Sequence, residues 1–313
     1  MIDKKNMRGK DENNGKKDQK YTRVEEVRPG IYAYIQEDGG WFLDNAGFIV
    51  GEDDTIVIDS LSNAIKTNNF INEIKKITDK LGIPYIFKSS FDKANRSSLK
   101  GKRGIGLEGA VPVFKKIKDE LGLPIVTDIH TEAQCEFWAK SGVVDMLQIP
   151  AFLCRQTDLV LAAGQTGLAI NVKKGQFLAP WDVKNIVEKL ESTGNTNILL
   201  TERGTTFGYG YLVVDMTSFP EMRKASGDYP VVIDATHGVQ RPGSLGVSTG
   251  GNREYAYVLA RASVAAGVGA VFLETHEDPD NAASDGPNSV RLDKLEEILT
   301  NLKAIDKVAK SIK

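Results

Sequence analysis

Eight short runs rich in valine and isoleucine recur along the chain and constrain its fold more than any other feature. Most of the stretches between them have the period and residue types of helices, and several end in glycine, the usual residue just past a helix. The runs are residues 55–59, 85–89, 125–129, 145–149, 169–173, 198–202, 231–235 and 271–275. This alternation predicts an α/β protein, a (β/α)8 TIM barrel with its active site at the C-terminal ends of the strands. A doubly wound parallel sheet is the alternative, because periodicity alone does not show that a barrel closes.

Composition limits the class of partner. The 313-residue chain is 41% hydrophobic and 26% charged, which suits a globular protein with a sizeable core. Its net charge of −2 argues against nucleic acid as a partner and favours small anions bound by local basic groups. No run approaches the roughly 20 apolar residues of a membrane span, so no membrane partner is expected. A polar N-terminus and only two cysteines, Cys135 and Cys154, favour the reducing cytoplasm.

The chain divides into three predicted segments. Residues 1–20 contain almost no apolar side chains, so we expect a disordered tail. Residues 21–53 alternate β-forming residues with turn signals such as Pro-Gly and Asp-Gly-Gly, which predicts a short β-hairpin extension. Residues 54–313 are predicted to form the barrel.

Ionisable and amide side chains stand at or just past the ends of the predicted strands. The cationic ones would form a positively charged bowl in a nearly neutral protein: Lys88, Lys93, Arg96, Lys173 and Arg203. Lysine offers a point charge and arginine a two-pronged donor, and both suit phosphate and carboxylate groups. The bowl therefore predicts one or two substrates with several negative charges, although any single member could instead form a salt bridge or cap a helix.

A second set of residues, beside the bowl, has the chemistry of metal ligands. His237, Glu274 and Asp285 supply one imidazole and two carboxylates, a mixed set that suits a divalent Mn, Fe or Zn ion. Three candidates scattered along a sequence are weak evidence for a metal by themselves. No organic cofactor is expected.

Longer motifs resemble a known family from about residue 68 to the end of the chain. They include FKSSFDKANRSS (87–98), TDIH (127–130), IPAFLCRQTDL (149–159), NVKKGQF (171–177), DATHGVQ (234–240) and ETHEDPDNAASDGPNS (274–289). Together they closely resemble the 3-deoxy-D-manno-octulosonate 8-phosphate synthase family. The resemblance implies a transferase of lipopolysaccharide (KDO) biosynthesis that condenses phosphoenolpyruvate with arabinose 5-phosphate and water and releases phosphate. It also implies a homotetramer.

The resemblance implies a role for each of several residues. Lys173 and Arg203 would hold the phosphate of phosphoenolpyruvate, and Lys88 and Gln148 would lie near its carboxylate and backbone. The KANRSS segment would take the sugar, with Arg96 and Ser97 on the 5-phosphate and Lys93 and Asn95 toward the hydroxyls and the aldehyde. The residues expected to act on the reacting atoms are Lys93, Asn95, Asp128 and His237. Whether Asp128, His237 or a bound metal manages the proton is left open by the sequence.

The N-terminal fifth departs from the family pattern. Family members begin with a strand that ends in a cysteine or an asparagine, which divides metal-using from metal-free enzymes; here Asp59 falls at that position. Residues 22–62 instead resemble the opening hairpins of the metallo-β-lactamase superfamily. The histidine-rich HxHxDH cluster of that superfamily is missing, since the three histidines are His130, His237 and His276, so a hydrolase of that type is improbable.

Two outcomes follow from this departure. In one, residues 55–59 close the barrel and Asp59 joins His237, Glu274 and Asp285 as a metal ligand. In the other, the strand fits poorly and the protein is an inactive phosphosugar-binding barrel. A related synthase that condenses phosphoenolpyruvate with another sugar is a further alternative.

Overall fold

The computed structural model describes most of the chain beyond its N-terminal segment. The described residues are 22–28, 31–36, 46–51, 55–58, 64–95, 99, 103–241, 250–282 and 285–312. Among the residues with predicted roles, Asp59, Arg96 and Ser97 lie outside these ranges, as does the predicted tail, residues 1–20.

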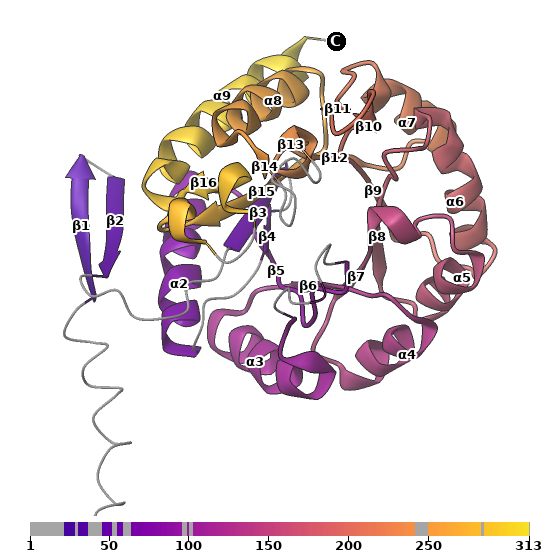
Figure 1. Cartoon of the computed structure of the whole chain (residues 1–313), viewed down its shortest axis with the longest axis horizontal. Coiled ribbons are helices and arrows are strands. Elements are labelled where there is room, and N and C mark those ends of the chain that lie inside the picture. The colour runs from indigo at the N-terminus through magenta and orange to yellow at the C-terminus, as the bar shows by residue number, and fades with distance from the viewer. Residues whose placement is uncertain are drawn as a thin grey trace, which may run out of the picture.

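Eight strands that run in the same direction form the wall of a barrel (Figure 1). They are β4 (Thr55–Ile58), β5 (Ile86–Lys88), β6 (Ile125–Asp128), β7 (Met146–Ile149), β8 (Ala169–Lys173), β9 (Ile198–Glu202), β12 (Val231–Asp234) and β15 (Ala270–His276). Each pairs in parallel with the next from β4 to β12, and β12 pairs in parallel with β15. All eight predicted runs are therefore strands, and the (β/α)8 prediction is confirmed over the doubly wound alternative.

The barrel closes through a ninth strand. β3 (Ala46–Gly51) lies antiparallel between β15 and β4, with Gly47 opposite both Glu274 and Ile58. The sequence predicts that residues 55–59 close the barrel and that residues 46–51 belong to a separate hairpin; instead β3 occupies the seam. The physical reason is that β4 and β15 would otherwise each present unpaired backbone groups along one edge. The predicted boundary after residue 53 thus falls between two paired strands, and the division into three segments stays a prediction.

The remaining strands lie outside the barrel wall or in its loops. β1 (Thr22–Arg28) and β2 (Ile31–Gln36) form an antiparallel hairpin outside the barrel wall (Figure 1). Two further antiparallel pairs lie in the loops that follow β9 and β12: β10 (Thr205–Thr206) with β11 (Leu212–Val213), and β13 (Gln240–Arg241) with β14 (Gly250–Gly251). β16 (Val290–Arg291) pairs in parallel with the end of β15.

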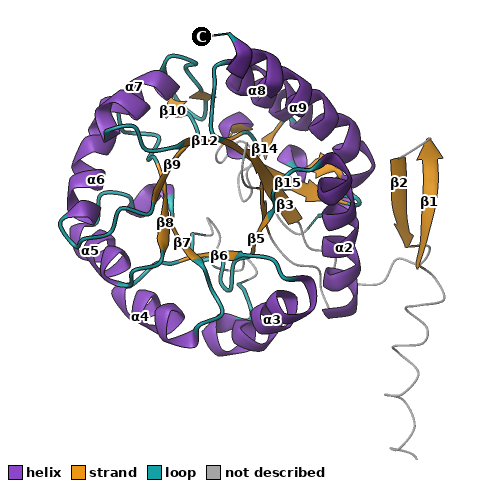
Figure 2. Cartoon of the chain, turned by 180° about the vertical axis from the view of Figure 1, so that it is seen from behind, coloured by secondary structure: helices purple, strands orange, loops and turns teal. Residues whose placement is uncertain are grey.

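Helices cover the outside of the barrel wall (Figure 2). They are α2 (Ala64–Leu81), α3 (Gly106–Leu121), α4 (Glu132–Ser141), α5 (Thr157–Gln165), α6 (Val183–Glu191), α7 (Ser218–Ser226), α8 (Arg253–Ala265) and α9 (Leu295–Ser311). Four of them are followed by a glycine in the left-handed conformation, Gly82, Gly122, Gly142 and Gly227, as the sequence predicts. No helix in the described part of the chain is long and apolar enough to cross a membrane.

Short 3-10 helices fill the loops at the ends of several strands. They are η1 (Ala151–Leu153), η2 (Pro180–Asp182), η3 (His237–Val239), η4 (Pro279–Asn281), η5 (Gly286–Asn288) and η6 (Leu292–Lys294). Two of them, η3 and η5, begin at or beside predicted metal ligands.

Successive side chains of each barrel strand point alternately outward, into the core beneath the helices, and inward, into the barrel interior. Side chains such as Phe87, Ile125 and Leu147 pack outward against the helices in the main hydrophobic cluster. Their neighbours face the inside of the barrel, where a smaller apolar cluster forms from Ile86, Val126, Met146, Val232, Ala270 and Phe272. Two residues further along the same strands, toward their C-terminal ends, the inward positions are polar: Lys88, Asp128, Gln148, Asp234 and Glu274. The alternation therefore brings the predicted site residues to one end of the barrel interior.

Candidate active site

A buried ion pair joins two neighbouring parts of the site. Lys173 at the end of β8 contacts Asp234 at the end of β12, and the Lys173 ammonium lies 3.7 Å from the centroid of the Phe272 ring. Asp234 also accepts a hydrogen bond from the backbone N–H of His237 and lies 2.8 Å from its Nδ1 atom. Burial alone would raise the pKa of Asp234, but His237 and Lys173 hold it well below its ordinary value. Asp234 therefore stays ionised and holds both a cation and an imidazole in place.

A second buried group stands across the barrel. The Lys88 ammonium donates a hydrogen bond to Ser90 Oγ at 2.6 Å and lies 3.3 Å from Asp128 Oδ1. The other carboxylate oxygen of Asp128 lies 3.1 Å from His130 Nε2. Burial would raise the pKa of Asp128, but Lys88 and His130 bring it well below its ordinary value. At neutral pH this carboxylate is thus ionised and accepts hydrogen bonds.

The low pKa of Asp128 predicts a pH-dependent contribution to stability. A carboxyl that binds protons less readily in the folded than in the unfolded protein stabilises the fold above its unfolded pKa of about 3.9, and the contribution is lost as the pH falls below it. We expect Asp128→Asn to lower the free energy of unfolding most at pH 7. At pH 3 the loss relative to the unmodified protein should be about 1.3 kcal/mol smaller. Urea denaturation at several pH values measures this; a difference that does not change with pH would contradict the assignment.

Arg203 lies just past β9 and belongs to a chain of polar side chains. Its Nη2 donates to Gln240 Oε1 at 2.9 Å, and Gln240 Nε2 donates to Asp285 Oδ1 at 2.7 Å. Burial lowers the pKa of Arg203, and Asp234 and Asp285 oppose that shift; an arginine remains charged under such a shift. Arg203 and Lys173 are both nearly fully buried, so the site holds two desolvated cations suited to a polyanion.

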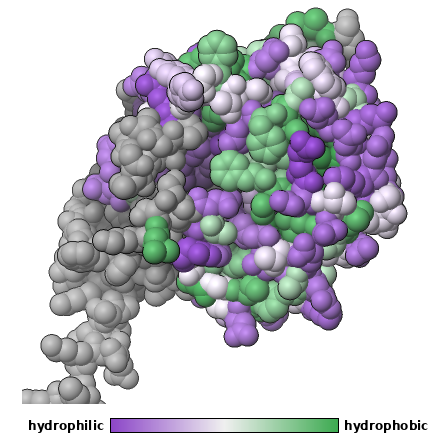
Figure 3. All heavy atoms as spheres, turned by 45° about the vertical axis from the view of Figure 1, so that its right-hand side comes forward, coloured by the Kyte–Doolittle hydropathy of each residue, from purple (hydrophilic) through white to green (hydrophobic). Residues whose placement is uncertain are grey.

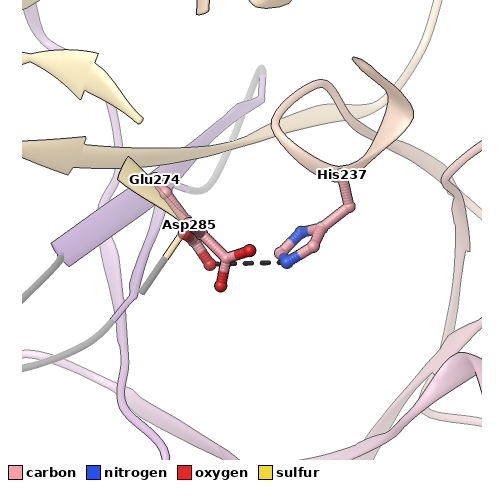
Figure 4. Close-up of side chains that lie close together, drawn as sticks. All are labelled: His237, Glu274 and Asp285. Carbon is pink, nitrogen blue, oxygen red and sulfur yellow. Dashed lines mark ion pairs between the residues drawn. The ribbon is translucent and has the colours of Figure 1, made fainter. Parts of the chain in front are cut away.

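His237, Glu274 and Asp285 converge from three elements (Figure 4). One ligand atom from each lies within 4.8 Å of the other two, and His237 Nε2 is 3.5 Å from Glu274 Oε1. Asp285 adopts a left-handed backbone with φ of +51°, an uncommon state for a residue other than glycine. The predicted set is therefore brought together, with Asp285 held in a strained conformation at the start of η5.

The donors suit a divalent metal. Asp234 engages Nδ1 of His237 and leaves Nε2 turned toward Glu274 and Asp285, an orientation that a carboxylate commonly gives to a metal-binding histidine (Figure 4). One nitrogen and two carboxylates match the preferences of Mn, Fe and Zn.

Several residues of the site were not predicted from the sequence. Gln240, Ser90 and Phe272 are given no role by the sequence pattern. In the structure His130 contacts Asp128, Gln240 links Arg203 to Asp285, and Phe272 lies under Lys173. The TDIH and DATHGVQ motifs contain two of these residues, so the motifs were the signal that pointed to them.

Comparison with known proteins agrees with this geometry. The model of the DAHP synthetase I family matches residues 40–311. The chain belongs to the DAHP synthetase I family. It is 58% identical over 238 residues to the 2-dehydro-3-deoxyphosphooctonate aldolase of Chelativorans sp. (strain BNC1), which covers 76% of this chain and 85% of the relative. Proteins of the same name from Brucella ovis and Brucella anthropi are 60% identical over 239 residues, with the same coverage.

The DAHP synthetase I match bears on the N-terminal segment. It begins at residue 40 and so includes both β3 and β4. The expected resemblance of residues 22–62 to metallo-β-lactamase hairpins receives no support from these comparisons. Strands 46–51 and 55–58 are barrel strands by their pairing.

The predicted sugar-binding segment of this family member follows β5. Lys93 is half-buried and Asn95 is exposed in the loop between β5 and α3. The base of the loop is closed by an ion pair between Arg103 and Asp92 and by a hydrogen bond from Gly106 N–H to Phe91 O at 3.0 Å. The loop is therefore held at both ends.

Gly104 allows the two ends of this loop to approach. A Cβ atom at this position would lie 1.9 Å from the carbonyl oxygen of Phe91, closer than any real contact. We expect Gly104→Ala to displace the loop and to lower kcat/KM for the sugar substrate by about 10²-fold, with a smaller effect on KM for the other substrate. Steady-state kinetics with each substrate varied measures this.

Gly109 in α3 provides the matched control for that substitution. A Cβ there would meet only ordinary contacts of 3.5 Å or more, and alanine favours a helix interior. Gly109→Ala is expected to leave both KM values unchanged; equal kinetics in the two variants would contradict the role given to Gly104.

Proposed function

We propose that this protein condenses phosphoenolpyruvate with arabinose 5-phosphate and water, giving 3-deoxy-D-manno-octulosonate 8-phosphate and phosphate. The observation on which this rests is the convergence of three buried cations, Lys88, Lys173 and Arg203, at the C-terminal end of a barrel. Two phosphorylated substrates need such charge, and the relatives described above have a name that refers to the same product.

The first substrate fits the buried part of the site. Lys173 and Arg203 would hold its phosphate, and Lys88 with Gln148 would face its carboxylate. Gln148 accepts a hydrogen bond from Asn171 Nδ2 at 3.3 Å, which orients its amide. Because these groups are buried, they act in a medium of low dielectric, where their charge is felt more strongly than in water.

The sugar would lie farther from the barrel core than phosphoenolpyruvate, next to the loop that follows β5. Lys93 and Asn95 would bind the hydroxyls and the aldehyde, and Arg96 and Ser97 the 5-phosphate. Binding both substrates together places C3 of the enol near the aldehyde carbon, which supplies much of the rate.

The reaction forms one carbon–carbon bond, at C3, and one carbon–oxygen bond, at C2, and it breaks the bond between C2 and the phosphate oxygen. C3 of phosphoenolpyruvate forms a bond to the aldehyde carbon, whose oxygen takes a proton. Water adds to C2, loses a proton, and the phosphate leaves. Asp128 and His237 are the candidate groups for holding these protons, since both face the barrel interior and have hydrogen-bonding partners that fix them.

His237, Glu274 and Asp285 would hold a divalent Mn, Fe or Zn ion, with Asp59 as a further proposed ligand. Such an ion, when bound, would act as a Lewis acid toward the aldehyde oxygen.

The protein is proposed to work as a homotetramer in the cytoplasm. Hydrophobic side chains interrupt the hydrophilic surface in Figure 3. Large exposed ones lie in the loops after β7, β8 and β9: Phe152, Phe177, Trp181, Phe207, Tyr209 and Tyr211. Clustered exposed aromatic groups of this kind mark protein–protein contacts.

Phosphate release by the purified protein tests the proposal. Incubation with both substrates should release phosphate only when both are present, and erythrose 4-phosphate or N-acetylmannosamine in place of arabinose 5-phosphate should give far less. Preference for one of these sugars would favour a related synthase. No turnover with any added metal would favour the inactive phosphosugar-binding barrel.

A further inference from the structure

A buried ion pair is formed by the sequence neighbours of the two cations that are proposed to bind phosphate, Lys173 and Arg203. The Lys174 ammonium is 3.5 Å from Glu202 Oε1, and the side chains are 0% and 2% exposed. Neither residue faces the barrel interior, because each is adjacent in sequence to an inward-facing residue. Lys174 follows Lys173, and Glu202 precedes Arg203.

Lys174 ties together two loops at the catalytic end of the barrel. Its ammonium donates to Leu178 O at 3.1 Å and to Gly175 O at 3.3 Å, both in the loop after β8. It also donates to Thr205 Oγ1 at 3.3 Å, in the loop after β9. The ammonium thus has three acceptors, two in the loop after β8 and one in the loop after β9.

Glu202 completes the link from the side of β9. Its Oε1 accepts a hydrogen bond from Gly204 N–H at 2.6 Å, which turns the chain just past Arg203. Gly204 has a φ of +93°, and a Cβ there would press on Leu212 at 3.3 Å. The carboxylate therefore fixes the backbone on one side of Arg203, as Lys174 fixes it on one side of Lys173.

We propose that the Lys174–Glu202 pair is a positioning device that sets the separation of Lys173 and Arg203 and so tunes the affinity for phosphoenolpyruvate. This rests on the proposed function, since it takes Lys173 and Arg203 as the phosphate ligands. A buried ion pair is a poor source of net stability compared with an apolar pair of similar size. Its value here is geometric, because the same two charges orient four backbone or hydroxyl groups in the loops that follow both cations.

A charge-neutral double variant tests the proposal without leaving a buried charge alone. K174M/E202Q removes both charges and keeps the volume of the side chains. K184M/E188Q is the matched control, because that pair has a similar separation of 3.6 Å but lies exposed on α6. The readouts are the thermal midpoint, KM for each substrate, and the Kd of phosphoenolpyruvate by calorimetry in the absence of sugar.

The expected result is selective. In K174M/E202Q the Kd and KM of phosphoenolpyruvate should rise by about tenfold or more, while KM for arabinose 5-phosphate changes by less than about twofold. The control pair should change neither. If the double variant does not fold, Thr205→Val, which removes one acceptor of Lys174 and leaves the ion pair, should raise the same Kd by a smaller factor.

Different failures have different meanings. An unchanged Kd for phosphoenolpyruvate in a folded K174M/E202Q variant, or in Thr205→Val where the double variant does not fold, would overturn the positioning role and leave the proposed function standing. An equal rise in both KM values would also overturn it, since that is what a general loosening of the fold would cause. Absence of phosphoenolpyruvate binding and of turnover in the unmodified protein would overturn the proposed function itself, and the positioning role with it.

Discussion

Lys173→Met is expected to lower kcat/KM for phosphoenolpyruvate by about 10³-fold and to destabilise the fold by about 3–5 kcal/mol. Lys173 is proposed to hold the phosphate of the substrate, and it is the cation that pairs with the fully buried Asp234. Removing it leaves that carboxylate facing His237 and Arg203 without its nearest counter-charge. Phosphate-release kinetics and urea denaturation measure the two effects.

The two effects of Lys173→Met can be separated with a second substitution. K173M/D234N removes both charges of the pair, so stability should recover in large part while activity stays low. Lys184→Met, which breaks an exposed ion pair with Glu188 on α6, is expected to change neither quantity. Unchanged KM and kcat in Lys173→Met would contradict its assignment to the phosphate.

Glu274→Gln is expected to weaken the binding of Mn²⁺ by more than about 10²-fold and to reduce turnover to a similar extent. The substitution keeps the size of the side chain but removes one of the carboxylate ligands proposed beside His237. Calorimetry with MnCl2 measures the affinity, and turnover after chelation and readdition of Mn²⁺ measures the requirement. Full turnover by metal-stripped parent protein would contradict a catalytic metal.

Asp234→Asn tests the group that orients the proposed imidazole ligand. Its Oδ2 lies 2.8 Å from His237 Nδ1, and loss of such a partner costs about 10–100-fold in metal affinity or activity. An effect smaller than that of Glu274→Gln is therefore expected, and an equal or larger loss of Mn²⁺ affinity would place Asp234 itself among the ligands.

Much of the catalytic end could be predicted from the sequence because the relevant pattern is local. Lys88, Asp128 and Asp234 each end a short strand, and Gln148 is next to last in its strand. The two-residue period places these side chains on the same face as the apolar residues two positions earlier. Parallel strands in one barrel then bring them to the same end.

Partners distant in sequence could not be predicted in the same way. Gln240 lies between Arg203 and Asp285, separated from them by 37 and 45 residues. Nothing in the residue types themselves requires this contact, since an amide suits many partners. The contact exists because η3 and η5 follow neighbouring strands of the closed barrel.

The sequence by itself determined the number of β-forming runs, their order along the chain and the chemical types at their ends. It did so because side-chain alternation and helix periodicity are properties of neighbouring residues. Only the tertiary structure decided that β3 fills the seam between β4 and β15, and that His237, Glu274 and Asp285 converge. Ring closure pairs segments more than 200 residues apart, as β3 with β15, and pairing over such distances depends on the whole fold rather than on any local pattern.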